Sequence, residues 1–314
     1  MSILTNTALT YEAQTAGSTD DMLSRTLDVI SPIDTHLWSA IKKDSDEVKQ
    51  DKQEWLTRSL AAAAENAQLE GDQRTPSALS ESTRIYNNHQ ILAKIFAISG
   101  SREKTSSPSN VNSEAYNVAE QLKLLAQDLE YMAWRGVRQD GATATARKAR
   151  GALNWMTTNV TNLNGGTVAA DGTISGGSKL ALTKQMVKDT MQNCFVSGGK
   201  PTKLYAGPFQ VNKISEFADI GNYRREVDKG KMEDYVDIYR SPTGQVEIIT
   251  HRNFPTDVVA TMDLSHWKKA IWRPVKKELV PSNIDGRVID LRTECTVVAR
   301  AEASSGRVVN LENS

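Results

Sequence analysis

A long polar excursion between residues 42 and 99 limits what this chain can fold into more than any other feature. From Asp44 to about Ser82 the segment is polar, and "EWLTRSL" is its only strand-like piece on the way out. On the way back, "STRIYNNHQILAKIFAIS" is rich in β-branched and aromatic residues and predicts a strand. The stretch between them, "AAAAENAQLEGDQRTPSALSES", has almost no side chain large enough to pack. We therefore expect a finger, residues 42–99, that runs out from a globular body and returns to it.

The reach of this finger indicates how it is used. About 17 residues in each leg, at roughly 3.3 Å per residue, extend on the order of 50 Å. A domain of this size does not cover so long a finger, and an isolated two-stranded hairpin is only marginally stable in water. The finger is therefore expected to become ordered against something else, most economically a neighbouring copy of the chain.

The residues before the finger are expected to form a thin arm. In "DDMLSRTLDVI" the apolar residues recur at helical spacing and predict a short amphipathic helix. Pro32 ends this helix, because proline does not continue a regular helix and favours extended geometry at the residue before it. Asp34 or Thr35 can then cap a second short helix over "HLWSAI", which carries Trp38.

Residues 111–139 predict a long amphipathic helix. Small or apolar residues recur at steps of four, three, four, three and four, at Val118, Leu122, Leu125, Leu129, Met132 and Gly136. At 1.5 Å per residue the helix would be roughly 40 Å long, which suits it to be a backbone for flanking sheets.

The second half of the chain reads as α+β. Residues 160–178 contain Gly-rich turns typical of a surface hairpin. The stretch "KLALTKQMVKDTMQNCF" predicts a helix, and "KPTKLYAGPFQVNKISEF" predicts a strand, a Gly-Pro turn and another helix. Three strand-rich stretches follow, in which we expect antiparallel pairing: "QVEIITHRNF", "VVATMDLSHWKKAIWRP" and "RVIDLRTECTVVARAEASSGRVVNL".

Composition excludes several classes of protein. The chain has 314 residues, enough for one large or two ordinary domains, and its 38 basic and 38 acidic residues give no net field that would draw it to nucleic acid or anionic lipid. Neither a secretory signal nor a long apolar run occurs, so we expect a cytoplasmic protein. Cys194 and Cys295 are far apart and lack metal-ligand spacing, which predicts two buried, reduced thiols.

Motifs for catalysis or for cofactor and metal binding are not found. The sequence has no GxGxxG, GxxxxGK[ST] or GxSxG pattern, and "SGGKPT" is interpreted as a turn. None of its four histidines has paired ligand spacing, and each is expected at the surface or half-buried. We therefore predict no catalytic, cofactor-binding or metal-binding residue.

Two clusters remain as candidate contact sites. "ARKAR" carries Arg147, Lys148 and Arg150, the densest basic patch, which either faces DNA or forms a solvated or subunit-contacting face; the second interpretation is favoured. Trp267 and Trp272 flank "KKAI", where packing beneath lysine stems is favoured over stacking on a ligand. The sequence therefore indicates an interface protein more readily than an enzyme.

Several phrases, in a fixed order along nearly the whole chain, resemble one known family. They are "DDMLSRTLDVISPIDTHLWSAI", "EWLTRSLAAAAENAQLEG", "NNHQILAKIFAISGS", "LKLLAQDLEYMAW", "ARGALNWM", "GGKPTKLYAGPFQVNKISEF", "VDIYRSPTGQVEII" and "IDLRTECTVVARAEASSGRVVNL". Their order and spacing resemble the tailed-bacteriophage major capsid proteins of the Hong Kong 97 fold, in the subgroup whose arm ends in an "isP.dTP" phrase. This chain departs from that phrase at "DTHLW", where His36 stands in place of the usual proline.

The resemblance implies an α+β fold in four parts. Residues 1–41 would be the N-terminal arm, and residues 42–99 the extended loop, a long β-hairpin that lies over a neighbouring subunit. Residues 100–150 and 285–314 would form the peripheral domain, with the long helix as its spine and an antiparallel sheet. Residues 151–284 would form the axial domain, which crowds round the five-fold and six-fold axes of a shell.

The resemblance also implies a structural major capsid protein, not an enzyme. It would self-assemble into pentamers and hexamers and form the icosahedral head shell round packaged double-stranded DNA. The implied partners are other copies of the chain, a portal protein, decoration proteins as a further candidate, and packaged DNA in non-specific contact, without a membrane. A separate scaffolding protein is expected because the arm begins almost at residue 1.

The implied location is the virion capsid, assembled in the host cytoplasm. No Lys, Asn and Glu trio matches the relatives that cross-link their subunits, so no autocatalytic cross-linking is expected.

Five residues are predicted to make inter-subunit contacts. Glu70, Gly71 and Arg74 lie at the tip of the finger, and Trp38 and Trp55 are apolar anchors near the arm and the base of the finger. Two other classes of function fit the sequence less well. An encapsulin-like compartment shell is disfavoured because the matched phrases are those of the phage subgroup. A cytoplasmic hydrolase or binding enzyme lacks a catalytic constellation.

Overall fold

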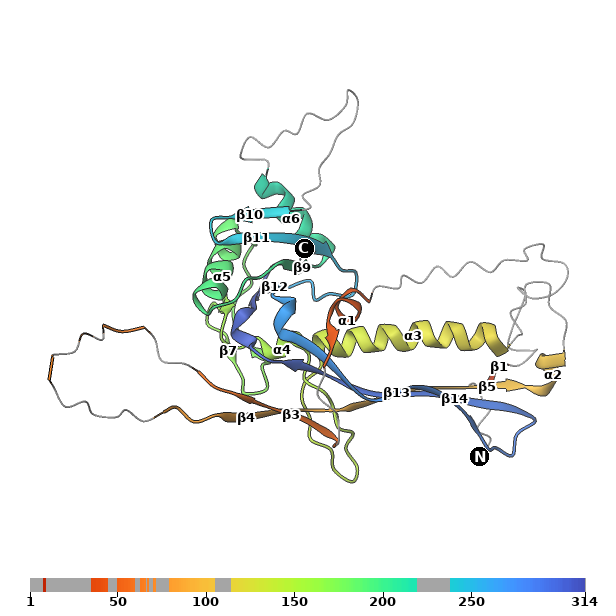
Figure 1. Cartoon of the computed structure of the whole chain (residues 1–314). Coiled ribbons are helices and arrows are strands. Elements are labelled where there is room, and N and C mark those ends of the chain that lie inside the picture. The colour runs from red at the N-terminus through yellow and green to blue at the C-terminus, as the bar shows by residue number, and fades with distance from the viewer. Residues whose placement is uncertain are drawn as a thin grey trace, which may run out of the picture.

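The computed structural model describes residues 8–9, 35–44, 50–59, 63–65, 67, 70–71, 79–104, 114–218 and 238–313. Within these ranges, two β-sheets and a long helix carry the fold, and a two-stranded finger projects from the body (Figure 1). The chain has the α+β architecture that the sequence predicts.

A five-stranded sheet lies beside the long helix (Figure 1). Its order is β1 (Ala8–Leu9), β5 (Gln90–Ser99), β14 (Gly286–Ala299), β13 (Trp267–Val280) and β2 (Lys42–Lys43). The central strand β14 pairs antiparallel with both β5 and β13. Its residues are buried on both faces along almost the whole strand, as expected for a central strand that is rich in β-branched residues.

The long helix α3 (Glu114–Arg135) confirms the helix predicted over residues 111–139. Its apolar face packs on the five-stranded sheet, where Leu125 contacts Ile289 and Leu291 of β14. The helix ends before Gly136, where a Cβ atom would lie 2.4 Å from the carbonyl oxygen of Ala149. Only glycine allows the chain to pass so close to that backbone.

The finger begins as a regular hairpin. Strand β3 (Lys52–Thr57) pairs antiparallel with β4 (Thr83–Asn88), from Lys52 opposite Asn88 to Thr57 opposite Thr83. One residue, His89, separates β4 from β5, so the return leg of the finger continues directly into the sheet. Both strands predicted on the way out and back are confirmed.

A short helix, α1 (His36–Ala40), precedes the finger, as predicted. Its N-cap residue Thr35 makes no side-chain capping hydrogen bond. Leu37 and Ile41 are buried in the main hydrophobic core. The amphipathic helix predicted within residues 20–30 and the stop at Pro32 lie outside the described residues.

A six-stranded sheet forms the other body of the fold (Figure 1). Its order is β10 (Ile238–Ser241), β11 (Gly244–Thr250), β9 (Lys203–Ala206), β12 (Val259–Met262), β15 (Gly306–Val308) and β6 (Val160–Thr161). The predicted helices α5 (Lys184–Val196) and α6 (Pro208–Ala218) lie against it. The expected antiparallel pairing is found for β11 with β10, for β12 with β15 and for β13 with β14, but β11 also pairs with β9, and that pairing is parallel.

The remaining elements are short. They are α2 (Gly100–Lys104), α4 (Ala152–Trp155), the hairpin β7 (Thr167–Val168) and β8 (Ile174–Ser175), and the 3-10 turns Leu264–His266 and Glu302–Ser304. The two sheets exchange strands across the boundary expected at 284/285: β13 lies in the sheet of β14, and β15 lies in the sheet of β12.

Buried polar residues correct one expectation. His89 and His251 are fully buried, although every histidine was expected at the surface or half-buried; His36 and His266 are half-buried. The rings of Trp134 and Phe254 enclose His251. The two cysteines are free and buried, as predicted.

Candidate inter-subunit interface

The root of the finger, residues 52–55 and 85–89, is fixed to its own chain. The indole of Trp55 is 4 % exposed, and its ring centroid lies 5.5 Å from that of Trp155 in α4. The guanidinium of Arg150 lies 4.5 Å from the Trp155 ring centroid. Trp55, predicted as an apolar anchor near the base of the finger, thus packs inside its own subunit.

Asn87 ties β4 to the segment that follows α3. Its side-chain amide donates to the carbonyl oxygens of Arg150 (3.0 Å) and Val297 (2.8 Å). Its side-chain oxygen accepts from the backbone N–H of Arg150 at 2.8 Å. The neighbouring Asn88 donates to the backbone oxygen of Gln139 at 2.9 Å. These buried hydrogen bonds fix the direction in which the finger leaves the body, since each would be costly to break without a substitute.

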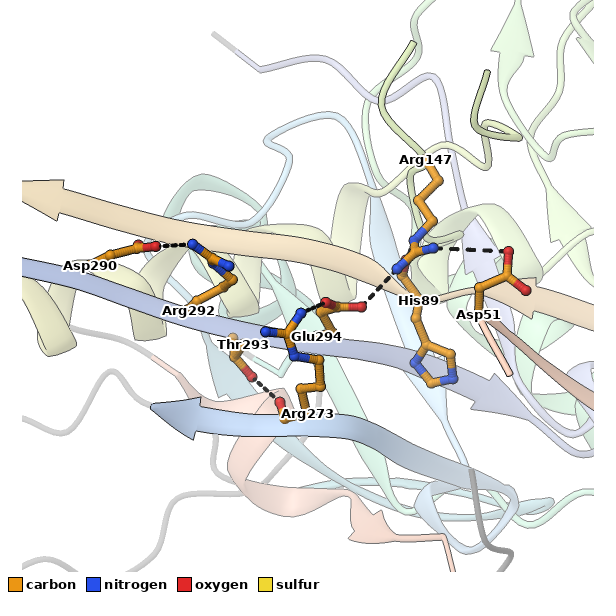
Figure 2. Close-up of polar contacts among 8 residues, drawn as sticks. All are labelled: Asp51, His89, Arg147, Arg273, Asp290, Arg292, Thr293 and Glu294. Carbon is orange, nitrogen blue, oxygen red and sulfur yellow. Dashed lines mark hydrogen bonds and ion pairs between the residues drawn. The ribbon is translucent and has the colours of Figure 1, made fainter. Parts of the chain in front are cut away.

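A charged cluster lies beside the root (Figure 2). Figure 2 shows Arg147 between Asp51 and Glu294. Arg147 donates to a Glu294 oxygen at 2.7 Å and to the backbone oxygen of His89 at 2.7 Å, while Asp51 lies 3.9 Å away. The other Glu294 oxygen accepts from Arg273 of β13. Because the Glu294 side chain is 3 % exposed, its two arginines supply the compensation that a buried carboxylate needs.

The imidazole of His89 lies in this cluster without a hydrogen bond of its own. Both ring nitrogens are buried and have no partner within the described part of the chain. The ring centroid is 5.9 Å from that of Trp272, over which Arg147 also lies. Burial, with the nearby charge of Arg147, lowers the pKa of His89 to about 4.

The outer finger, residues 56–84, differs from the root. Leu56 and Leu79 are 68 % and 81 % exposed. Glu70 and Gly71 are exposed at the tip, and Gly71 has a φ of +80° with nothing near the position of a Cβ atom. Arg74, the third tip residue predicted to contact a neighbour, lies outside the described residues. Large apolar side chains thus stand in solvent on the outer finger.

The short helix α1, which precedes the finger, is anchored through Glu130 of α3. Its carboxylate, 2 % exposed, accepts from the backbone N–H groups of Leu37 and Trp38, both at 2.8 Å. It also accepts from Nε1 of Trp134 at 2.9 Å and from Nε2 of His251 at 3.1 Å. Glu130 therefore supplies the cap that Thr35 does not, because the first N–H groups of a helix have no partner within it.

Trp38 is half-buried and packs against two of the hydrophobic clusters. The ammonium of Lys269 lies 5.4 Å from its ring centroid and donates to its backbone oxygen at 2.6 Å. The structure thus places this predicted anchor, a residue of α1, against β13 of its own chain.

The basic patch is divided by the fold. Arg150 is buried and donates to the backbone oxygen of Asn154, and Arg147 is half-buried in the charged cluster. The side chain of Lys148 is exposed. Burial lowers the pKa of Arg150. Most of this patch is therefore engaged with the chain itself.

Sequence reasoning missed Glu130, His89 and Glu294. Glu294 had a detectable signal, because it is an acid in the otherwise apolar "TECTVV" stretch of a central strand. Glu130 adjoins the apolar stripe of α3, where the helical period allows a polar residue. Most of their partners are distant in the sequence: Leu37 and Trp38 of α1, His251 just after β11, Arg147 after α3 and Arg273 of β13. No local pattern predicts those contacts.

Among the described residues, no helix is both long and apolar enough to cross a membrane. Within the same ranges, no group of three or more His, Cys, Asp or Glu side chains is arranged to hold a metal ion.

Solved structures share this fold. The "Cyanophage A-1(L) capsid asymmetric unit" aligns with a TM-score of 0.68 at 13% identity, over 96% of this chain and 99% of that one. The "Capsid of native GTA particle" aligns at 0.59 and 12% identity, over 94% and 96%. A chain of "Microbacterium phage Oxtober96" aligns at 0.55 and 11% identity, over 91% and 95%. At such identities the likeness establishes the fold, that of the Hong Kong 97 capsid proteins, and nothing finer.

The family follows from the sequence itself. No curated protein matches the chain. The profile of the SU10 major capsid protein family, in contrast, matches residues 3–312, nearly the whole chain. Together with the capsid fold, this confirms the resemblance drawn from the sequence phrases. The chain therefore belongs to the SU10 major capsid protein family: it is a structural protein of the virion, not an enzyme, and forms the icosahedral head shell of a tailed phage.

Proposed function

We propose that the finger is the element by which each subunit clamps a neighbouring copy in the shell. One observation carries the proposal: the root of the finger is held by its own subunit, whereas the outer finger exposes Leu56 and Leu79. A rigid base directs the outer finger away from the body, and burial of its leucines requires a second surface. Burying a leucine contributes about 1.5–3 kcal/mol, so the contact is favourable when a neighbour arrives.

The tip residues Glu70 and Gly71, with Arg74, are proposed to lie on the neighbour. The positive φ of Gly71 is a conformation that glycine adopts without strain, which suits a turn at the tip. In a closed shell the same contact repeats round five-fold and six-fold axes, so the chain would form pentamers and hexamers. Each bound subunit then raises the effective concentration of the next contact.

Further partners belong to the same proposal. A separate scaffolding protein would set the curvature of the growing shell, a portal protein would occupy one vertex, and decoration proteins would bind the finished surface. Packaged double-stranded DNA would touch the inner surface without sequence preference. The exposed Lys148 is the member of the basic patch best placed for such a contact, because Arg147 and Arg150 are engaged within the chain.

Deletion of residues 66–77 tests the clamp. The variant is expected to keep the circular dichroism of the wild type, since the root carries the contacts that hold the finger to the body, but to form no shells by negative-stain microscopy. Replacement of the same residues by a Gly-Ser linker of equal length is the control for length. Shells of normal size from the linker variant would show that the tip makes no essential contact.

A further inference from the structure

We propose that His89 is an acid-sensitive latch: its uncharged ring keeps the root of the finger closed, and protonation of the ring opens the junction between β4 and β5. The position is suited to this role. His89 is the single residue between the two strands, so a change in its side chain acts where the finger joins the sheet.

The backbone of His89 is held firmly on both sides. Its N–H donates to the backbone oxygen of Asp51 at 2.9 Å, across the two legs of the finger. Its carbonyl oxygen accepts from Nε of Arg147 at 2.7 Å. The ring therefore cannot move out into water while these contacts persist, and it is fully buried.

The surroundings do not stabilise a charged ring. The charged groups round it come from three places: Asp51 before β3, Arg147 from the segment after α3, and Glu294 from β14. Glu294 is occupied by Arg147 and by Arg273 of β13 (Figure 2). Asp51 is half-exposed and also faces Arg147. A proton on His89 would thus meet a guanidinium and carboxylates that are already paired, with no acceptor for either ring N–H.

The His89 ring is therefore expected to become protonated when it leaves its buried position. In the closed root the pKa of His89 is lowered from 6.5 to about 4 by burial and by Arg147. Once the junction opens, the ring reaches water and its ordinary pKa returns. Between pH 6.5 and about pH 4, opening of the junction is therefore coupled to the binding of one proton. In that range the equilibrium constant for opening rises about tenfold for each unit that the pH falls, and it levels off below about pH 4. The closed state is stable at neutral pH and is lost on acidification.

The proposed latch at His89 would make the contact between the finger and its neighbour dependent on pH. The local opening depends only on the root, whereas any effect on shells rests on the proposed role of the finger. If both hold, mild acid would loosen the root in every subunit and so change how the finger lies on its neighbour.

Hydrogen exchange of the full chain tests the latch. Between pH 6.5 and pH 4, exchange of peptides covering residues 83–95, corrected for the intrinsic rate, is expected to reveal an opening constant that rises about 80-fold. In His89→Phe, which keeps an aromatic ring but cannot titrate, the rise should vanish. His266→Gln is the matched control, since His266 is half-exposed, and it should keep the wild-type rise. An equal rise in His89→Phe would overturn the proposal.

A second measurement does not depend on a folded variant. The exchange rate of the carbon-bound ring hydrogen reports the pKa of each histidine in the wild-type chain, and His89 is expected near 4. A value close to 6.5 would refute the latch. Acid treatment of assembled shells distinguishes the two proposals: opening at the root without any change in shell dimensions would support the latch and contradict the clamp.

Discussion

Replacing Glu130 by glutamine tests how the short helix α1, which precedes the finger, is held. The carboxylate accepts four hydrogen bonds, two of them from the first N–H groups of α1. Glutamine keeps one oxygen but places an NH2 group against the N–H of Trp38. This loses one charge-assisted hydrogen bond, about 2 kcal/mol, and strands a buried N–H, about 1 kcal/mol. The free energy of unfolding should therefore fall by about 3 kcal/mol.

Denaturant unfolding of the isolated subunit, followed by circular dichroism, measures this loss, and hydrogen exchange of residues 35–44 localises it. The matched control is Glu120→Gln on the same helix, where Glu120 is half-buried; its unfolding free energy should change by less than about 0.5 kcal/mol. A change in Glu130→Gln as small as in the control would refute the reasoning. It would mean that α1 is held by the packing of Leu37 and Ile41 alone.

Three other perturbations test the root and the core. Trp55→Ala should lower the unfolding free energy by about 3–5 kcal/mol, because it leaves a cavity against Trp155, and calorimetry measures that loss. Arg147→Gln leaves the buried Glu294 with one guanidinium, so the denaturant midpoint should fall by an amount equivalent to about 2 kcal/mol; an unchanged midpoint would contradict the pairing. Burial raises the pKa of Cys194 to about 11 and that of Cys295 to about 12, so at pH 8 a thiol reagent should label neither until the chain unfolds.

Sequence patterns correctly predicted the helices and strands that depend mainly on residues close together in the sequence. The apolar spacing of α3 and the β-branched residues of β4 and β5 each indicate one structure, and the chain adopts it. The parallel pairing of β11 with β9 was missed, since it depends on the path of the chain through α6. Pairing across a sheet is a non-local choice that strand propensity alone does not fix.

The polar centre of the root shows a different limit of sequence reading. His89 and Glu294 lie 205 positions apart, and Arg147 joins them through contacts that the sequence does not record. Read as part of "ARKAR", Arg147 resembled a surface charge; in the fold its guanidinium compensates a buried carboxylate. A charged residue in a loop is therefore ambiguous until its neighbours from other elements are known.

The contrast between root and outer finger bears on how a weak contact can build a stable shell. Ordering a residue costs about 1–2 kcal/mol of conformational entropy, and a finger that was free from its base would incur that cost along its whole length on binding. Here the subunit has already ordered the root through Trp55, Asn87 and Arg147. In the proposed clamp no ordering cost arises at the root, so more of the apolar burial at Leu56 and Leu79 would remain as net binding energy. Substitutions that loosen the root should therefore weaken assembly through the cost of ordering the finger, and light scattering of Asn87→Ala subunits, compared with Glu70→Gln at the tip, separates this effect from the loss of a tip contact.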